Sequence, residues 1–171
     1  GDYEVIVLCP SSVQDCYDLT IKAFNLAEKF RVPVIILSDE IVGHTREMLR
    51  IPENVEVRER QTPKEDPDNY QPYKAQPSGL LDNMPTFGKG YHLLVDGQLH
   101  DESGNRKGDD TRASEQLMKR LCYKITDHAD EIEDVRTAFI DHAKVLVLAY
   151  GSVARSALSA VRQARDRNLE V

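Results

Sequence analysis

The chain has 171 residues, of which 40% are hydrophobic, so it is long enough to bury a core. Its formal net charge of -7 argues against a nucleic-acid-binding protein, because neutralising phosphates takes a concentrated basic surface. The sequence contains no run of about 18 apolar residues and no secretory signal pattern, so we expect a cytoplasmic location without membrane contact.

Residues 3–40 predict a strand, a helix and a second strand. The apolar runs at 4–9 and 32–37 are rich in Val and Ile, as in parallel strands that are covered on both faces. Ser11 or Ser12 marks the start of the helix between them. Its apolar face repeats every three or four residues, through Val13, Tyr17, Ile21, Phe24 and Ala27.

Ser38, Asp39 and Glu40 follow the second strand, at the edge where open α/β sheets place ligands. Two interpretations stay open at this point. The three residues either face a ligand, or Ser38 or Asp39 caps a short helix over 41–49.

Residues 51–112 differ in composition from the rest of the chain. Six of the eight prolines and six of the nine glycines lie there, and no helical period survives. Residues 91–100 read as a β-hairpin, because Asp96-Gly97 suits a tight type I′ turn. A stretch of this kind serves as a binding segment, an arm around a partner or a connector between domains, and we expect an ordered connector.

A long helix over 111–139 and a second partial β-α-β unit follow. The second unit has a strand over 145–150, a tight turn at Gly151 and an amphipathic helix that Asn168 ends in a left-handed conformation. The fold class is therefore α/β, with two partial parallel units joined by the connector.

The Gly151 turn is the strongest candidate site. A strand that turns sharply into a helix presents free backbone amides and a positive dipole, so Gly151, Ser152, Arg155 and Ser156 form a candidate anion-binding set. The alternative is that Gly151 only makes the turn and Ser152 only caps the helix. No nucleotide-binding fingerprint accompanies the turn.

No metal site or nucleophile can be assigned from the residues. His92, His100, Asp101 and Glu102 could converge around the hairpin, but their spacing matches no standard ligand pattern, and we favour surface polar residues near a turn. The three cysteines contain no C-x-x-C pair and are expected to be reduced thiols: Cys9, Cys16 and Cys122.

Several short motifs, in order, resemble the alpha subunit of 2-oxoacid:ferredoxin oxidoreductases, in particular the 2-oxoglutarate type. The motifs are Cys9-Pro10-Ser11-Ser12, Tyr17-Asp18-Leu19-Thr20, 23–28, 32–35, 37–40, Asp96-Gly97, 100–104 and 149–155. The resemblance implies a thiamine-diphosphate enzyme that converts 2-oxoglutarate and coenzyme A to succinyl-CoA and CO2 and passes electrons to ferredoxin.

The resemblance also implies a division of the chain. Residues 1–50 would end a pyrimidine-type thiamine domain, 51–112 would be the connector with its hairpin, and 113–171 would form the long helix and the start of a transketolase-C-terminal-like domain. We therefore expect an internal fragment of the subunit, inactive alone and without catalytic residues, resident cofactor or metal of its own.

The complete complex would hold thiamine diphosphate, Mg2+ and an iron-sulfur cluster. Its partners would be a beta subunit and, in larger assemblies, gamma and delta subunits. A non-catalytic α/β assembly module and a small-anion binder at the Gly151 turn remain as alternatives.

Overall fold

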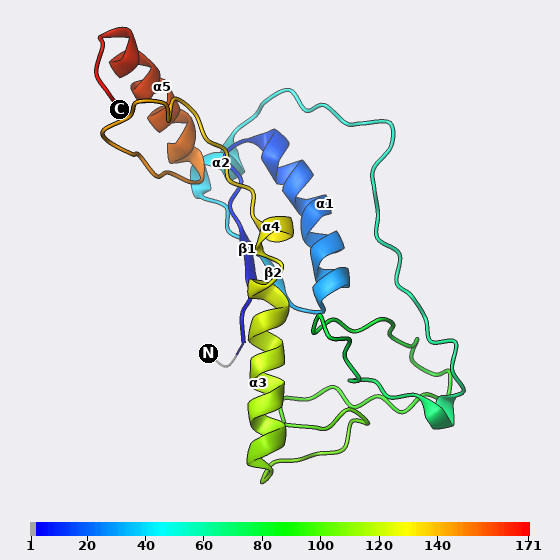
Figure 1. Cartoon of the computed structure of the whole chain (residues 1–171). Coiled ribbons are helices and arrows are strands. Elements are labelled where there is room, and N and C mark those ends of the chain that lie inside the picture. Colours follow the sequence, from blue (N-terminus) through cyan, green and yellow to red (C-terminus); the bar gives the residue numbers. More distant parts are fainter. Residues whose placement is uncertain (1–2) are drawn as a thin grey trace. The chain divides into compact units, whose positions relative to one another are not determined.

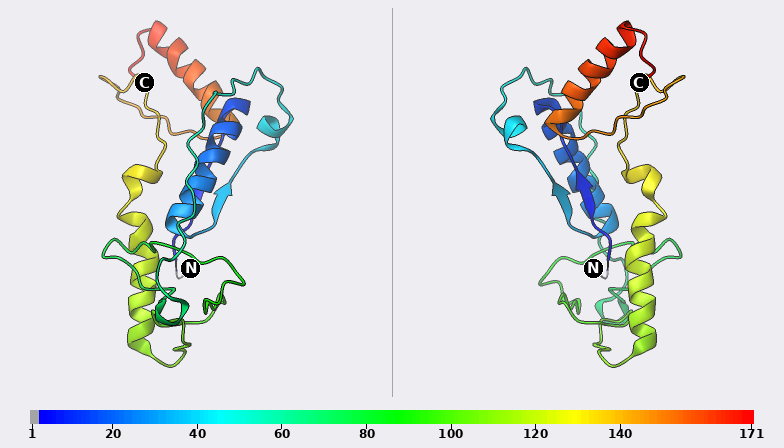
Figure 2. Two further views of the ribbon diagram at one scale, coloured as in Figure 1. Left: turned by 90° about the vertical axis from the view of Figure 1, so that its right-hand side faces the viewer. Right: turned by 90° about the vertical axis from the view of Figure 1, so that its left-hand side faces the viewer.

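The chain opens with the strand, helix and strand that the sequence predicts (Figure 1). In the computed structural model, which describes residues 3–171, β1 (Ile6–Leu8) and β2 (Val34–Ile36) pair in a two-stranded parallel sheet. Helix α1 (Val13–Phe30) connects them, as Figure 2 shows from two sides. This confirms the predicted α/β class.

Local hydrogen bonds explain where α1 begins and ends. The Asp15 amide donates to Ser12 Oγ at 3.0 Å, while the Ser11 amide donates to the Asp15 carboxylate at 3.1 Å. The first bond satisfies an amide of the first turn, and the second satisfies an amide just before the helix. Burial raises the pKa of Asp15, but hydrogen bonds from Ser11 and the Arg136 guanidinium outweigh it, and the pKa lies below its usual value. At the other end Arg31 takes a positive φ of 50°.

The residues group into two compact units. The first comprises residues 3–6, Asn25–Pro33 and Val57–Ile132, and the second comprises Val7–Phe24, Val34–Glu56 and Glu133–Val171. None of the helices within residues 3–171 is long and apolar enough to cross a membrane.

In the first unit, the connector lies against helix α3 (Thr111–Thr126), which Asp110 caps through the amides of Arg112 and Ala113. The connector contains one short 3-10 helix, η1 (Pro67–Asn69). Near the end of α1, Phe30 is 1% exposed and meets the His128 ring edge-on, with 5.4 Å between ring centroids.

The predicted single helix over 111–139 is wrong in its second half. Helix α3 ends at Thr126, a short helix α4 (Ala129–Ile132) follows, and residues 133–139 are not helical. The break has a local cause: the His128 amide donates to Ile125 O at 3.1 Å, a tightened bond three residues back that closes the helix.

The predicted hairpin over 91–100 is also wrong, because Gly97 does not take the positive φ that a type I′ turn needs. The Asp96 carboxylate instead accepts from the Gln98 amide at 3.0 Å and pairs with Arg106. A chain reversal forms one segment later, where His100 and Arg106 make an isolated antiparallel bridge and Gly104 has a φ of 84°.

The second unit contains helices α2 (Glu40–His44) and α5 (Ser152–Asp166). Helix α2 is shorter than the expected 41–49, because the Thr45 amide already donates to Val42 O and closes it. Helix α5 ends as predicted, with Asn168 at a φ of 60°.

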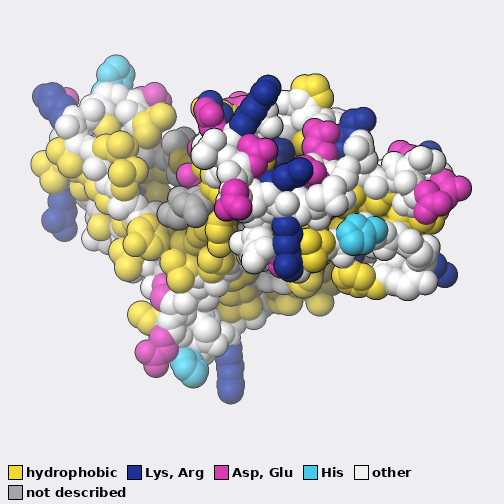
Figure 3. Space-filling view, turned by 90° about the horizontal axis from the view of Figure 1, so that it is seen from below, with side chains coloured by type: hydrophobic (Ala, Val, Ile, Leu, Met, Phe, Trp, Pro, Cys, Tyr) yellow, Lys and Arg dark blue, Asp and Glu magenta, His cyan; other side chains and the backbone are white. Residues whose placement is uncertain are grey.

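The strand predicted over 145–150 does not form within residues 3–171. Of the amides in this stretch, only that of Val145 donates to a backbone carbonyl; its acceptor is Glu170 O, which also accepts from the Lys144 amide. Leu146 and Leu148 are 69% and 88% exposed. In the space-filling view of Figure 3, hydrophobic side chains cover a large part of the visible face of the molecule. An apolar stretch without strand neighbours cannot make ladder hydrogen bonds.

Candidate functional site

A small pocket in the second unit collects residues from three separate segments. Its cavity of about 220 Å³ lies where β1, β2 and the Gly151 turn lead into helices. We call it the strand-end pocket, and its lining residues are Ser11, Ser12, Ile41, Val42, Thr45, Ser152, Arg155 and Ser156. It contains three of the four residues predicted to bind an anion, and Gly151 directly precedes them.

Asp39 links two helix N-termini beside the strand-end pocket. Its carboxylate accepts from the Ser152 amide at 2.7 Å and from the Val42 amide at 2.9 Å. These bonds, first the one from Ser152 and then the one from Val42, hold the pKa of Asp39 below its usual value. Of the two interpretations of 38–40, capping is therefore what Asp39 does, and it caps α5 as well as α2.

Gly151 is required by this contact. Its φ is 64°, and a Cβ added there would lie 2.8 Å from Asp39 Oδ2. Any side chain would thus strain the backbone and displace the carboxylate.

Glu47 forms an ion pair with Arg155, another of the residues predicted to bind an anion. Its carboxylate pairs with the Arg155 guanidinium and accepts from the Val13 amide at 3.3 Å. The bond from Arg155, followed by that from Val13, lowers the pKa of Glu47. Sequence reasoning missed Glu47, because 108 residues separate it from Arg155 and no local pattern marks the pair.

The four polar residues predicted around the hairpin do not assemble into a metal site. The His100 ring stacks on Tyr73, with centroids 3.6 Å apart, and the Asp101 carboxylate accepts from the amides of Ser103 and Asn105 inside the chain reversal. Within residues 3–171, no group of three or more His, Cys, Asp or Glu side chains could hold a metal ion. Cys9, Cys16 and Cys122 are free thiols.

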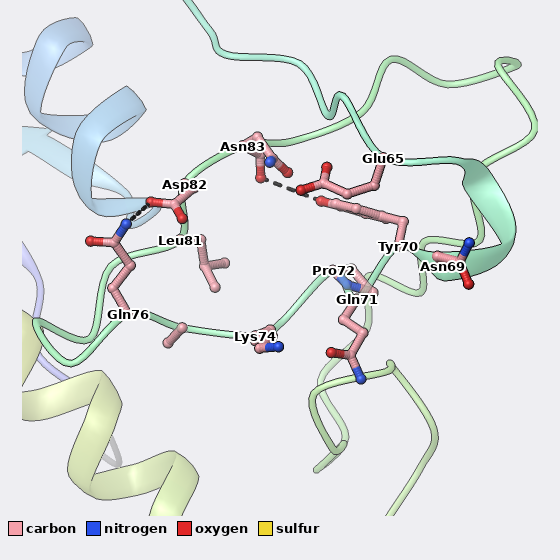
Figure 4. Close-up of a pocket in the computed structure, with 11 residues that line it drawn as sticks. Glu65, Asn69, Tyr70, Gln71, Pro72, Lys74, Gln76, Leu81, Asp82 and Asn83 are labelled. Atoms are coloured by element: carbon pink, nitrogen blue, oxygen red, sulfur yellow. Dashed lines mark hydrogen bonds between the residues drawn. The ribbon is translucent and has the colours of Figure 1, made fainter.

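A second hollow, of about 430 Å³, lies within the connector loops (Figure 4). Along the wall of this hollow, the Tyr70 hydroxyl donates a hydrogen bond to Asn83 O at 3.3 Å, and the Gln76 side-chain amide donates one to the Asp82 carboxylate. Its lining comes from residues 65–83 alone, so no second element contributes a functional group to it.

Comparisons with known proteins agree with the resemblance drawn from the motifs. The 2-oxoglutarate synthase subunit KorA of Methanothermobacter marburgensis is 48% identical over 99% of this chain, and the chain spans 45% of that relative's length. The ketoisovalerate oxidoreductase subunit VorB of the same organism is 57% identical, but over 31% of this chain and 15% of its own length.

A solved structure shows the same fold. The 2-oxoglutarate:ferredoxin oxidoreductase from Magnetococcus marinus, with 2-oxoglutarate, coenzyme A and succinyl-CoA bound, superposes with a TM-score of 0.79 at 23% identity. The match covers 100% of this chain and 30% of that one. The family model described as pyruvate flavodoxin/ferredoxin oxidoreductase, thiamine diphosphate-binding, matches residues 1–120. Because this match covers more than half of the chain, the chain belongs to that oxidoreductase family.

Proposed function

We propose that the chain is part of the alpha subunit of a 2-oxoacid:ferredoxin oxidoreductase of the 2-oxoglutarate type. The observation that carries this proposal is the 48% identity to a 2-oxoglutarate synthase subunit over 99% of the chain. The similarity to the ketoisovalerate enzyme is confined to 53 residues, so it supports the family and not the branched-chain substrate.

The proposed reaction is oxidative decarboxylation. 2-Oxoglutarate and coenzyme A give succinyl-CoA and CO2, and two electrons pass to ferredoxin through an iron-sulfur cluster. Catalysis takes place in a cytoplasmic complex with a beta subunit, to which gamma and delta subunits can be added. No catalytic residue is assigned to this chain.

The strand-end pocket does not fit Mg2+-thiamine diphosphate. Mg2+ is held by carboxylates together with phosphate oxygens, yet none of the eight residues that line the pocket is a carboxylate. The Arg155 cation is already paired with Glu47. We therefore propose that the beta subunit, and not this pocket, anchors the diphosphate of the cofactor.

The division of the chain is part of the same proposal. Residues 1–50 belong to a pyrimidine-type thiamine domain, 51–112 to the connector, and 113–171 to the start of a transketolase-C-terminal-like domain. Two observations support it: the family match ends at residue 120, near the proposed start of the last segment, and residues 51–110 contain no α-helix or strand, only η1.

The experiment is an assay of the full chain purified with its beta subunit. Coenzyme A-dependent reduction of ferredoxin is measured with 2-oxoglutarate, pyruvate and 2-oxoisovalerate, and we expect 2-oxoglutarate to be turned over fastest. Faster turnover of 2-oxoisovalerate would contradict the substrate. No reduction with any of the three would favour the assembly module.

Small-anion binding at Gly151, Ser152, Arg155 and Ser156 is a second proposal. It is supported by the three of these residues that line the strand-end pocket. An anion would have to compete with Asp39 for the Ser152 amide and with Glu47 for the Arg155 guanidinium. In a phosphate titration followed at the Ser152 amide resonance, Arg155→Ala should abolish the shift and Asp39→Ala should enhance it. A Ser152 amide that does not respond to phosphate in the unaltered protein would overturn this proposal.

A further inference from the structure

The first unit contains a cavity in which cationic and apolar side chains meet. It measures about 460 Å³ and lies between the connector, helix α3 and the residue that follows α1. Three of its lining residues are cations, Arg31, Arg120 and Lys124. We call this space the basic cavity. Its apolar wall includes Leu81, Met84, Leu93, Leu117, Met118 and Leu121.

Among residues 3–171, two of the three cations have no counter-ion. Lys124 is 3% exposed, and in the described part of the chain its Nζ donates to one acceptor, Arg31 O, at 3.4 Å. Arg120 donates to Gly79 O, also at 3.4 Å. Within residues 3–171 neither side chain forms an ion pair.

The third cation is only partly satisfied. Arg31 Nη1 lies 3.0 Å from a Glu28 carboxylate oxygen, but its Nε is buried without a hydrogen-bond partner in the described part of the chain. Among the described residues that line the basic cavity, Asp96 is the only carboxylate, and it is already paired with Arg106.

This arrangement is costly unless a negative group joins it. Burying a charge without a partner destabilises the folded state, and a lysine responds by losing affinity for its proton. Burial, together with the nearby Arg120 charge, lowers the pKa of Lys124 to about 8. Burial likewise lowers the pKa of Arg120.

We propose that the basic cavity is a binding site for a small amphiphilic carboxylate. The carboxylate accepts hydrogen bonds from Lys124 and Arg120, with Arg31 Nε as a third donor, and the aliphatic or aromatic body lies against the leucine and methionine side chains. A ligand pocket with an apolar wall and a few convergent polar groups has this composition. Inorganic phosphate offers the charge without the apolar body and is therefore the poorer ligand.

The test uses octanoate as the probe and the full chain in its assembled form. Met84 and Met118 line the basic cavity, whereas Met48 is 95% exposed and lies outside it. With methionine methyl groups labelled for NMR, octanoate should shift the Met84 and Met118 signals and leave that of Met48 unchanged. Octanamide, which has the same length and no charge, should bind about tenfold or more weakly, as expected from losing a charged hydrogen bond.

Two variants on helix α3 distinguish the basic cavity from general surface attraction. Lys124→Met replaces the ammonium-bearing chain with an unbranched, uncharged one and should weaken octanoate binding about tenfold or more. Lys119→Met removes an exposed lysine that pairs with Glu115 and should leave binding unchanged. Arg120→Gln should weaken octanoate binding in the same sense, which gives an independent reading if one variant folds poorly.

Three results would overturn the proposal. They are octanoate and octanamide binding equally well, Lys119→Met weakening binding as much as Lys124→Met, and the Met48 signal shifting together with those of Met84 and Met118. Failure of the 2-oxoacid assay has no bearing on it, because octanoate binding is measured without turnover.

Discussion

At the residue scale, Gly79 sets how closely the connector approaches helix α3. Its φ is 79°, and a Cβ added there would lie 3.0 Å from Lys124 Cβ. The same residue donates its amide to Gln76 O and accepts from Arg120. Backbone conformation and packing therefore both require glycine at this position.

Gly79→Ala should lower the free energy of unfolding by about 2–4 kcal/mol, since it adds a steric contact to the strain of a positive φ. Gly88 is a matched control: its φ is 80°, but a Cβ added there would meet nothing within 4 Å. Gly88→Ala should cost only the strain, about 1–2 kcal/mol. Urea denaturation measures both, and equal losses would show that the contact with Lys124 is not tight.

The buried Lys124 predicts a pH dependence of stability. Its pKa is about 8 in the folded chain and 10.5 ordinarily, so between these values the unfolded chain binds more protons. Stability should therefore rise with pH from about 8 to 10.5, and the full penalty of about 3 kcal/mol should be present below pH 8. The charged side chains that line the basic cavity with Lys124 are Arg31, Arg120 and Asp96, and its other titratable groups are His100, Tyr3, Tyr70 and Tyr73.

Lys124→Met should remove this penalty. We expect unfolding at pH 7 to require about 1–3 kcal/mol more than in the unaltered chain, with the rise between pH 8 and 10 abolished. Urea denaturation at pH 7 and at pH 9.5 tests it, with Lys119→Met as the control. A less stable Lys124→Met variant would mean that the ammonium group is better satisfied than its one hydrogen bond implies. Combined with loss of octanoate binding, a gain in stability would mark Lys124 as kept for binding.

At the element scale, one carboxylate serves the first turns of two helices. Asp39 accepts from Val42 at the start of α2 and from Ser152 at the start of α5. A carboxylate is favourable at both places, because unpaired amides and the helix dipole attract negative charge.

Asp39→Ala should increase hydrogen exchange at the Val42 and Ser152 amides, measured by NMR at pH 7. Asp39→Asn keeps an oxygen acceptor and should have a smaller effect. Since the pKa of Asp39 is lowered, its contribution should be complete above the ordinary value near 3.8 and vanish as the pH falls through the lower folded value. Unchanged exchange at Ser152 in Asp39→Ala would contradict the shared cap.

Elements determined by local bonds could be predicted from the sequence, and elements that need distant partners could not. Ser11 or Ser12 marked the start of α1, and Asn168 marked the end of α5, because the bonds at each of these ends lie within about one helical turn. The capping by Asp39 was one of two open readings. Its bond to Ser152 spans 113 residues and the Glu47–Arg155 pair spans 108, so no local pattern encodes either.

At the scale of the whole molecule, residues 145–150 have the sequence pattern of a strand but do not form one. The run Val145–Tyr150 has the composition of a buried parallel strand, yet Val145, Leu146 and Leu148 are all more than half exposed. A strand of this kind needs a neighbour for its backbone and cover for its side chains.

The burial of Lys124 was missed for the converse reason, since a polar residue on a helix gives no sign that a loop will cover it.

We expect residues 145–150 to be a paired strand in the assembled oxidoreductase. Hydrogen exchange measured by mass spectrometry should show slow exchange for 145–150 in the complex with the beta subunit and fast exchange in the 171-residue chain, because ladder hydrogen bonds protect amides only when a neighbouring strand is present. Residues 34–36 of β2 are the reference, since they are already paired with β1 and should be protected in both samples. Fast exchange of 145–150 in the complex, with β2 protected, would show that the exposed apolar run is not a strand of the complete enzyme.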